Sequence, residues 1–134
     1  MMNKLVASIE EHQADTLPAS QAQIEQAERE LGITFSQEYR GYLLSAGVLS
    51  YESQETYGLG VAEDSHLNII TALKDFRSIK GFPVSYIPLV DIGDGHYYIY
   101  DNATQKVLSI ALPDLGTREV STNMEDFLNG LIFG

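Results

Sequence analysis

The sequence contains no cysteine and few basic residues. Because cysteine is absent, disulfides, thiolate catalysis, iron–sulfur ligation and cysteine-rich zinc sites are excluded. Only 8 of the 134 residues are lysine or arginine, against 19 aspartates and glutamates, so the formal net charge is −11 at pH 7. A chain this acidic is repelled by phosphate backbones and anionic lipids, which argues against direct binding of nucleic acid or a membrane surface.

Long hydrophobic runs are missing as well. No stretch approaches the roughly 20 apolar residues that span a bilayer. Residues 1–11 lack the apolar core of a secretory signal peptide. We therefore interpret the sequon at Asn102 as a chance match in a turn, and we expect a cytoplasmic protein without a membrane-spanning segment.

The remaining composition is that of an ordinary globular protein. Hydrophobic residues make up 44% of the chain and charged residues 20%, which argues against disorder and fibrous classes. A chain of 134 residues can form one hydrophobic core and leaves little room for a second domain. We expect a single domain over residues 1–134.

Apolar residues recur at helical spacing in five segments. Each of these stripes predicts an amphipathic helix with one buried face. The segments are residues 2–9, 24–31, 39–46, 69–76 and 124–131, of which the second is the weakest.

Residues that begin and end helices flank these stripes. Ser20 with Gln23, and Thr122 with Glu125, have the spacing of a capping box. Gly32 follows the second stripe, where a left-handed glycine commonly ends a helix.

The middle of the chain has the pattern of strands and turns. Residues 85–91 and 106–110 are expected to be extended, and the aromatic and β-branched run at 96–100 favours a strand between them. Residues 48–52 and 57–61 are two further candidate strands. The expected fold is α+β, with helices covering one face of an antiparallel sheet whose meander lies near residues 84–110.

Four blocks of the sequence resemble, in the same order, the motifs of the SUKH superfamily. Residues 24–35 are similar to its acidic helix ending in Leu-Gly, and residues 36–47 to its tyrosine-bearing helix with a Leu-Leu pair and glycine. Residues 87–101 resemble its hairpin with a Gly-Asp-Gly turn, and residues 121–128 its last helix.

This resemblance implies an α+β fold without a catalytic centre or a cofactor. Bacterial members are mostly immunity proteins that bind and neutralise a cognate polymorphic toxin, often a nuclease. Fungal Smi/Knr-type relatives regulate cell-wall assembly through protein contacts. The resemblance therefore implies a protein-binding role and no enzymatic activity.

Motifs for metal binding and catalysis are also lacking in the residues themselves. His12, His66 and His96 are far apart and do not form a His-Glu-x-x-His pair. No Gly-x-Ser-x-Gly elbow is present, so no metal, cofactor or catalytic residue is predicted. A small enzyme remains an alternative only if a deep pocket is lined by His96 and two of Asp91, Asp94 and Asp101.

Tyrosines crowd the expected central strand. Strand alternation places His96, Tyr98 and Tyr100 on one face and Tyr97 on the other. If one face meets the core, the other can offer tyrosine rings as interface anchors. Packing of Tyr98 and Tyr100 under a loop explains the pattern equally well.

Acidic residues are concentrated in the first half of the chain. Residues 1–64 contain 11 acidic and 3 basic side chains, whereas residues 65–134 contain 8 and 5. Such charge in loops serves either binding or solubility. The predicted partner-binding residues are Glu52, Glu55, Tyr57, Asp91, Asp94, His96, Tyr98 and Tyr100.

The resemblance implies an immunity protein whose partner is a cognate toxin, and the acidic charge of the chain predicts that this toxin has a basic surface. A nuclease toxin needs a basic groove for phosphate, and an acidic partner would be steered into it. The alternative is a non-enzymatic regulatory or scaffold module of the cell-wall-regulator type.

Overall fold

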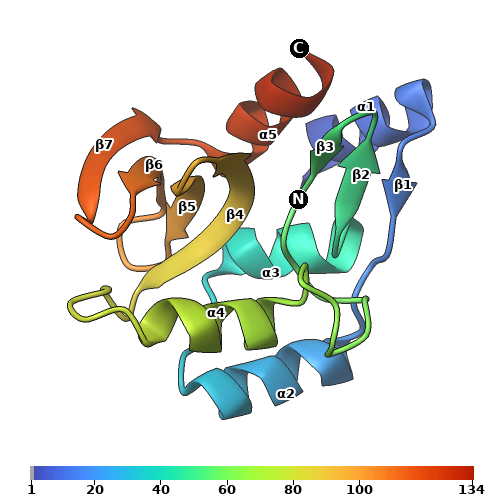
Figure 1. Ribbon diagram of the computed structural model, residues 1–134. Helices are drawn as coiled ribbons and strands as arrows, with labels where there is room; N and C mark the ends of the chain where they lie inside the picture. Colours follow the sequence, from blue (N-terminus) through green and yellow to red (C-terminus); the bar gives the residue numbers. More distant parts are fainter. Residues whose placement is uncertain (1) are drawn as a thin grey trace.

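The computed structural model describes residues 2–134, which form five helices and two antiparallel sheets (Figure 1). The helices are α1 (Asn3–His12), α2 (Gln21–Leu31), α3 (Gln37–Ser45), α4 (Ile69–Arg77) and α5 (Met124–Phe133). The smaller sheet contains β1 (Asp15–Thr16), β2 (Leu49–Tyr51) and β3 (Gln54–Glu55). The larger sheet contains β4 (Tyr86–Gly93), β5 (His96–Asp101), β6 (Lys106–Ala111) and β7 (Gly116–Ser121). The predicted α+β class is confirmed.

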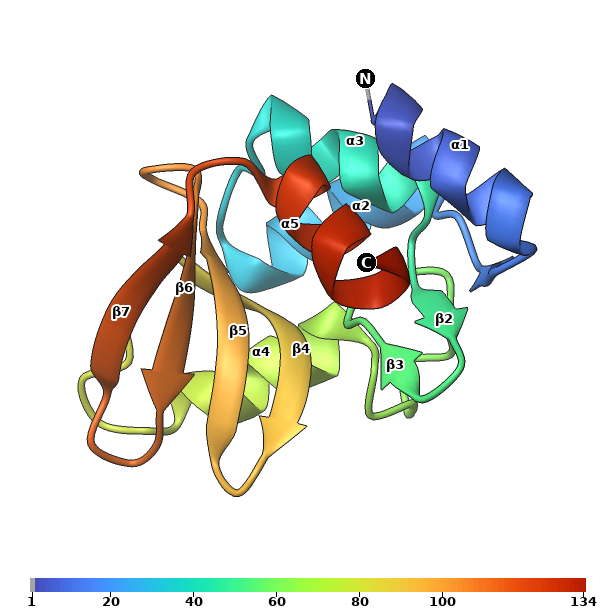
Figure 2. The ribbon, with the colours of Figure 1, turned by 90° about the horizontal axis from the view of Figure 1, so that it is seen from above.

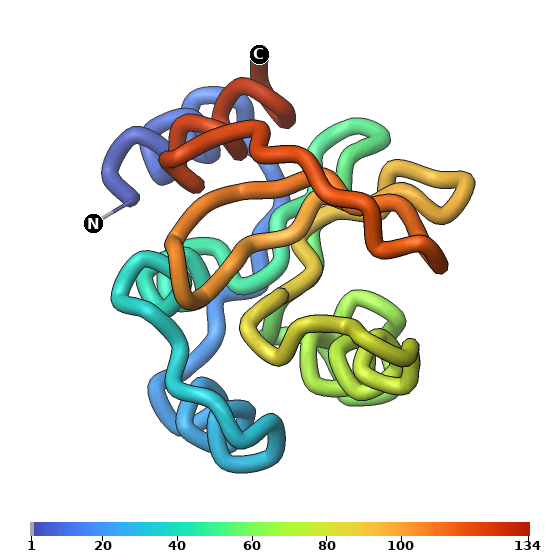
Figure 3. The backbone as a smooth tube through the Cα atoms, turned by 90° about the vertical axis from the view of Figure 1, so that its left-hand side faces the viewer, coloured from blue at the N-terminus to red at the C-terminus, as the bar shows by residue number. Residues whose placement is uncertain are grey.

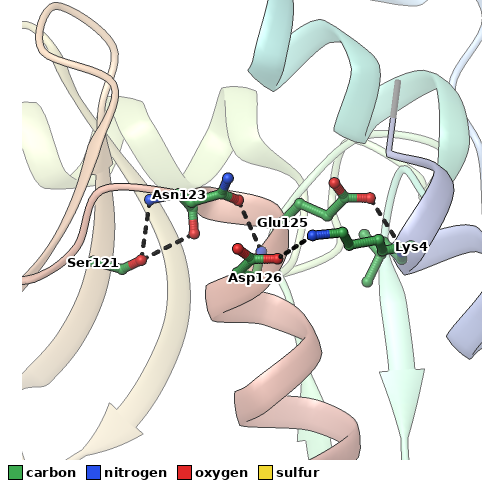
Figure 4. A network of polar contacts seen from close by, with 6 residues as sticks. Lys4, Ser121, Asn123, Glu125 and Asp126 are labelled. Atoms are coloured by element: carbon green, nitrogen blue, oxygen red, sulfur yellow. Dashed lines mark hydrogen bonds and ion pairs between the residues drawn. The ribbon is translucent and has the colours of Figure 1, made fainter.

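The helices begin and end largely where local chemistry predicts. The Ser20 hydroxyl accepts a hydrogen bond from the backbone N–H of Gln23, whose side chain accepts one from the Ser20 N–H. Gly32 ends α2 in the left-handed conformation, with φ 67°. The predicted capping box at Thr122 is wrong, because the side chain of Asn123 caps α5 by accepting from the Asp126 N–H at 2.9 Å (Figure 4).

The larger sheet is a meander in the order β4-β5-β6-β7 (Figure 2). The strands expected near residues 84–110 are present, and β7 extends the sheet by one strand that the sequence did not predict. Residues 57–61 do not form the expected strand; Gly58 makes only an isolated bridge to Asn68. The short strand β1 was also not predicted, since two residues are too few to show alternation.

Helices contact both faces of the larger sheet, so its cover is more extensive than predicted. Tyr97 and Tyr98 are consecutive in β5 and therefore point to opposite faces. Phe76 of α4 packs edge-on against Tyr97 with ring centroids 4.9 Å apart, and Phe127 of α5 packs against Tyr98 at 4.8 Å. In Figure 1, α5 lies above the sheet and α4 below it.

The first and last helices lie side by side (Figure 3). The Glu125 carboxylate accepts a hydrogen bond from the backbone N–H of Leu5, one of the first-turn amides of α1 that have no partner within the helix. Lys4 and Asp126 form an exposed ion pair beside it (Figure 4). No helix within residues 2–134 is long and apolar enough to cross a lipid bilayer.

Buried tyrosines join the helical layer to the larger sheet. Tyr39 and Tyr42 of α3 are fully buried, and the ring of Tyr39 stacks on that of Tyr100 with centroids 5.7 Å apart. The backbone N–H of Tyr57 donates a hydrogen bond to the carbonyl oxygen of Leu89 at 2.8 Å. This bond holds the segment that follows β3 against the outer edge of β4, and it positions the surface described next.

Candidate partner-binding surface

Two adjoining hollows lie where α4, the segment after β3 and the β4–β5 hairpin meet. Tyr57 and His66 line both of them. The α4 pocket has a volume of about 320 Å³ and is lined by Tyr57, His66, Thr71, Ala72, Asp75, Phe76, Ile79, Tyr97 and Leu112. The β4 pocket has a volume of about 380 Å³ and is lined by Ser53, Gln54, Glu55, Tyr57, His66, Leu67, Asp91, Ile92 and Gly93.

The structure brings part of the predicted set together at these pockets. Glu55, Tyr57 and Asp91 come from three separate segments and line the β4 pocket. Asp94 and His96 are exposed in the hairpin that follows Gly93. Glu52 is exposed in the turn between β2 and β3. Their role in binding remains a prediction.

The tyrosines are placed differently from the expectation. Tyr100 is fully buried, with its hydroxyl 2.7 Å from the Ser36 hydroxyl, so the expected surface anchor is wrong at this position. Tyr98 is half-buried against Phe127, on the face of the sheet opposite to the α4 pocket. Tyr57 is only 7% exposed and forms a wall of the pockets rather than a protruding anchor. The reason is that α3 and α5 cover the face to which Tyr98 and Tyr100 point.

Carboxylates without cationic partners line the two pockets and lie in the loops next to them: Asp75 lines the α4 pocket, and Glu55 and Asp91 line the β4 pocket. The ion pairs of residues 2–134 join Lys4 to Asp126, Arg40 to Glu28, Lys74 to Glu30 and Lys106 to Glu119. None of these pairs includes the acidic residues around the pockets and in the loop before His66. These residues, all exposed, are Glu52, Glu55, Glu63, Asp64, Asp75, Asp91 and Asp94. The surface therefore carries a concentrated and unneutralised negative charge.

Asp91 is the carboxylate most closely tied to the aromatic walls. It is paired with Tyr97 across β4 and β5, so both side chains point to the face that α4 covers. Burial raises the pKa of Tyr57 to about 12, and the negative charge of Asp91 adds to this shift. Burial and Asp91 also raise the pKa of Tyr97. Both phenols are protonated at neutral pH, as an unperturbed tyrosine also is, and can form hydrogen bonds with a ligand.

Most residues that line the pockets were not predicted, among them Ile92, His66 and Asp75. Ile92 is 47% exposed among the carboxylates, whereas His66 and Asp75 lie at the pocket rims. The register of β4 is irregular between Pro88 and Val90 and again beyond Asp91. Simple alternation therefore cannot place Ile92, although an isoleucine directly before a Gly-Asp-Gly turn was an available signal.

Comparison with known proteins identifies the family. A SUKH family model with the description "SMI1-KNR4 cell-wall" matches residues 2–132. The chain belongs to the SUKH family. A crystal structure of a protein from Pseudomonas syringae pv. tomato is similar to this SUKH chain, with a TM-score of 0.74 and 18% identity over 96% of each chain. At that identity the likeness shows a shared SUKH fold. No curated protein matches the sequence.

The SUKH family includes toxin immunity proteins, and the chemistry of this chain's surface suits binding. Within residues 2–134, no three His, Asp or Glu side chains are arranged to hold a metal ion. The enzyme alternative required a pocket lined by His96 with two aspartates, but His96 lines neither pocket. Asp101 is buried and accepts a hydrogen bond from the Ala103 N–H. What the pockets offer is shape, aromatic surface and negative charge.

Proposed function

We propose that this SUKH chain is a cytoplasmic, single-domain immunity protein that binds a cognate polymorphic toxin and neutralises it by protein–protein contact. The observation that carries the proposal is the set of unpaired carboxylates around two adjoining pockets. A toxin that acts on nucleic acid needs a basic groove for phosphate. The immunity protein occupies such a groove in a one-to-one complex and excludes the substrate.

The charge of the surface acts mainly on association. Complementary potentials steer two proteins together and can raise the association rate constant to about 10⁸–10⁹ M⁻¹s⁻¹ at low salt. Glu52, Glu55, Asp91 and Asp94 face basic residues of the toxin, and His96 lies at the rim of this contact. Exposed rim charges contribute little to the lifetime of the complex.

Apolar and aromatic groups supply the lasting part of the contact. Ile92 is exposed among carboxylates. Its apolar side chain is costly to hydrate and favourable to bury against a partner. The ring of Tyr57, which lines the same pocket as Ile92, offers a rigid aromatic surface. Tyr98 and Tyr100 have no part in this contact, because one lies on the other face of the sheet and the other lies in the core.

Co-expression with a candidate toxin tests the proposal. The toxin is taken from the gene adjacent to that of this chain, and growth of the host is measured. Wild-type chain restores growth, whereas the double variant Glu55→Lys/Asp91→Lys does not. The matched control is Glu10→Lys/Glu11→Lys, which reverses two exposed charges on α1 and preserves growth. Circular dichroism verifies that both variants fold.

Two outcomes would count against the proposal. Absence of rescue by the wild-type chain would reject toxin neutralisation for that pair. Rescue by Glu55→Lys/Asp91→Lys equal to that of the wild type would reject the proposed surface and leave the class of function standing.

A regulatory module is the second candidate, and the family description "cell-wall" favours it. In that role the same acidic surface would bind a basic region of a host protein instead of a toxin. Gene context separates the two roles: a neighbouring gene whose product ends in a small basic toxin domain supports immunity, and its absence supports regulation.

A further inference from the structure

The α4 pocket is built around three aromatic rings. The ring of Phe76 packs edge-on against both tyrosines: the Tyr97 centroid lies at 4.9 Å with an interplanar angle of 89°, and the Tyr57 centroid at 6.5 Å with an angle of 80°. All three rings border the same volume of about 320 Å³. Aromatic faces carry partial negative charge and attract cations.

Carboxylates flank these rings, and the cations of α4 are engaged elsewhere. Asp75 is exposed at the rim of the pocket, and Asp91 is paired with Tyr97 on the same face of the sheet. Lys74 forms an ion pair with Glu30 of α2. Arg77 donates a hydrogen bond to the carbonyl oxygen of Leu31 at 2.6 Å, also on the α2 side. The pocket is therefore both aromatic and electronegative.

Tyr57 contributes a polar group to the aromatic wall of the pocket. Tyr57 is 7% exposed, and it lines the pocket. The Tyr57 hydroxyl oxygen can accept a hydrogen bond from an N–H group that enters the pocket.

We propose that the α4 pocket accepts one arginine side chain of the partner protein. The guanidinium lies against Tyr57, Phe76 and Tyr97, and its N–H groups face the carboxylates of Asp75 and Asp91. Arginine fits better than lysine because its planar group stacks on aromatic rings and has several donors in a fixed plane. The inference rests on the proposed function, since it names the residue type by which a basic partner is recognised.

Titration with a small arginine probe tests the pocket without the toxin. Nα-acetyl-arginine methylamide is added to isotope-labelled chain, and NMR shifts are followed; the matched citrulline compound has nearly the same shape without the charge. Shifts concentrated at Tyr57, Phe76 and Tyr97 are expected, with affinity at least tenfold higher for arginine than for citrulline. Asp75→Asn and Asp91→Asn should each weaken binding about threefold or more, and Glu10→Gln should have no effect.

Several results would overturn the inference. These are equal binding of the citrulline compound, tighter binding of the corresponding lysine compound or of choline, and shifts centred away from the three rings. The comparison with growth rescue separates the two proposals. If the chain restores growth but the arginine compound does not bind in the α4 pocket, the arginine site alone is rejected. If the compound binds there but the chain does not restore growth, the site is supported and neutralisation of that toxin is rejected.

Discussion

Asp91 and Tyr97 stand directly opposite each other across strands β4 and β5. Their side chains share the face of the sheet against which α4 packs, so a charge and an aromatic wall meet at one corner of the molecule. Tyr57 reaches the same corner from the segment after β3, and Asp91 acts electrostatically on both phenols. The unpaired negative charge of the surface is thereby combined with groups that can bury a partner side chain.

The first prediction concerns salt. Association with a basic partner should slow by about tenfold or more as the salt concentration rises from about 50 to about 500 mM, because exposed charges are screened. Dissociation should change much less. Stopped-flow fluorescence measures both rate constants. An association rate that does not depend on salt would remove electrostatic steering from the mechanism.

The second prediction concerns Ile92. Ile92→Ser should weaken partner binding by about tenfold, because it removes an apolar contact from the centre of the surface. Stability should change by less than about 0.5 kcal/mol, since the side chain is exposed in the free chain. The control is Val84→Ser, an exposed valine just before the opposite end of β4. Calorimetric titration should show that this control binds the partner with unchanged affinity. If Ile92→Ser and Val84→Ser lose affinity equally, the prediction is contradicted.

The third prediction concerns close packing next to Tyr57. A Cβ atom added at Gly58 would overlap the carbonyl oxygen of Gly47, which belongs to the backbone and cannot move aside easily. Gly58→Ala should lower the free energy of unfolding by about 2–3 kcal/mol or more. Gly130→Ala in α5 meets no neighbour and should raise it by about 0.5–1 kcal/mol. Urea unfolding measures both, and a Gly58→Ala variant as stable as the wild type would show that the segment can relax.

The fourth prediction concerns alkaline pH. Burial raises the pKa values of Tyr39 and Tyr42 above those of unfolded tyrosine, near 10. The folded chain therefore keeps protons that the unfolded chain loses. The stabilisation that comes from the raised pKa values of these two tyrosines is complete below about pH 10. It is lost as the pH rises toward the folded pKa values, by about 1.4 kcal/mol per pH unit for each residue.

Urea unfolding between about pH 8 and pH 11 checks this dependence. Tyr42→Phe should lower stability at pH 8, because its hydroxyl donates to the carbonyl oxygen of Tyr57 at 2.6 Å. Above pH 10 the slope for this variant should be shallower than that of the wild type by about 1.4 kcal/mol per pH unit. Identical slopes would mean that Tyr42 ionises in the folded chain as readily as in the unfolded one.

Much of the fold could be predicted because its signals are local. The helical stripes and the Ser20–Gln23 box depend on side chains within a few residues of each other. In contrast, β7 lies at an edge of the sheet and most of its residues are exposed, so no apolar alternation marks it. The cap at Asn123 was missed because a neighbouring threonine with the right spacing is equally plausible in sequence.

The site could be predicted only in part, because it depends on contacts between distant segments. Charge and loop position pointed to Glu55 and Asp91, which line one pocket. Tyr100 was misplaced because the docking of α3 decides which face of β5 is covered, and no spacing within β5 encodes that. Asp75 could not be predicted, because its position at the pocket depends on how α4 packs against the sheet. Ile92 follows an irregular part of β4, so strand alternation does not show that its side chain is exposed.

The hydrogen bond from the Tyr57 amide to Leu89 has a consequence for dynamics. It crosses the junction between the segment after β3 and β4, and both pockets open beside it. Any separation of these two parts must expose this amide to water. A bound partner that spans the junction resists such separation. Deuterium uptake at the Tyr57 amide would therefore slow when the complex forms, and this slowing would show that the partner occupies the surface.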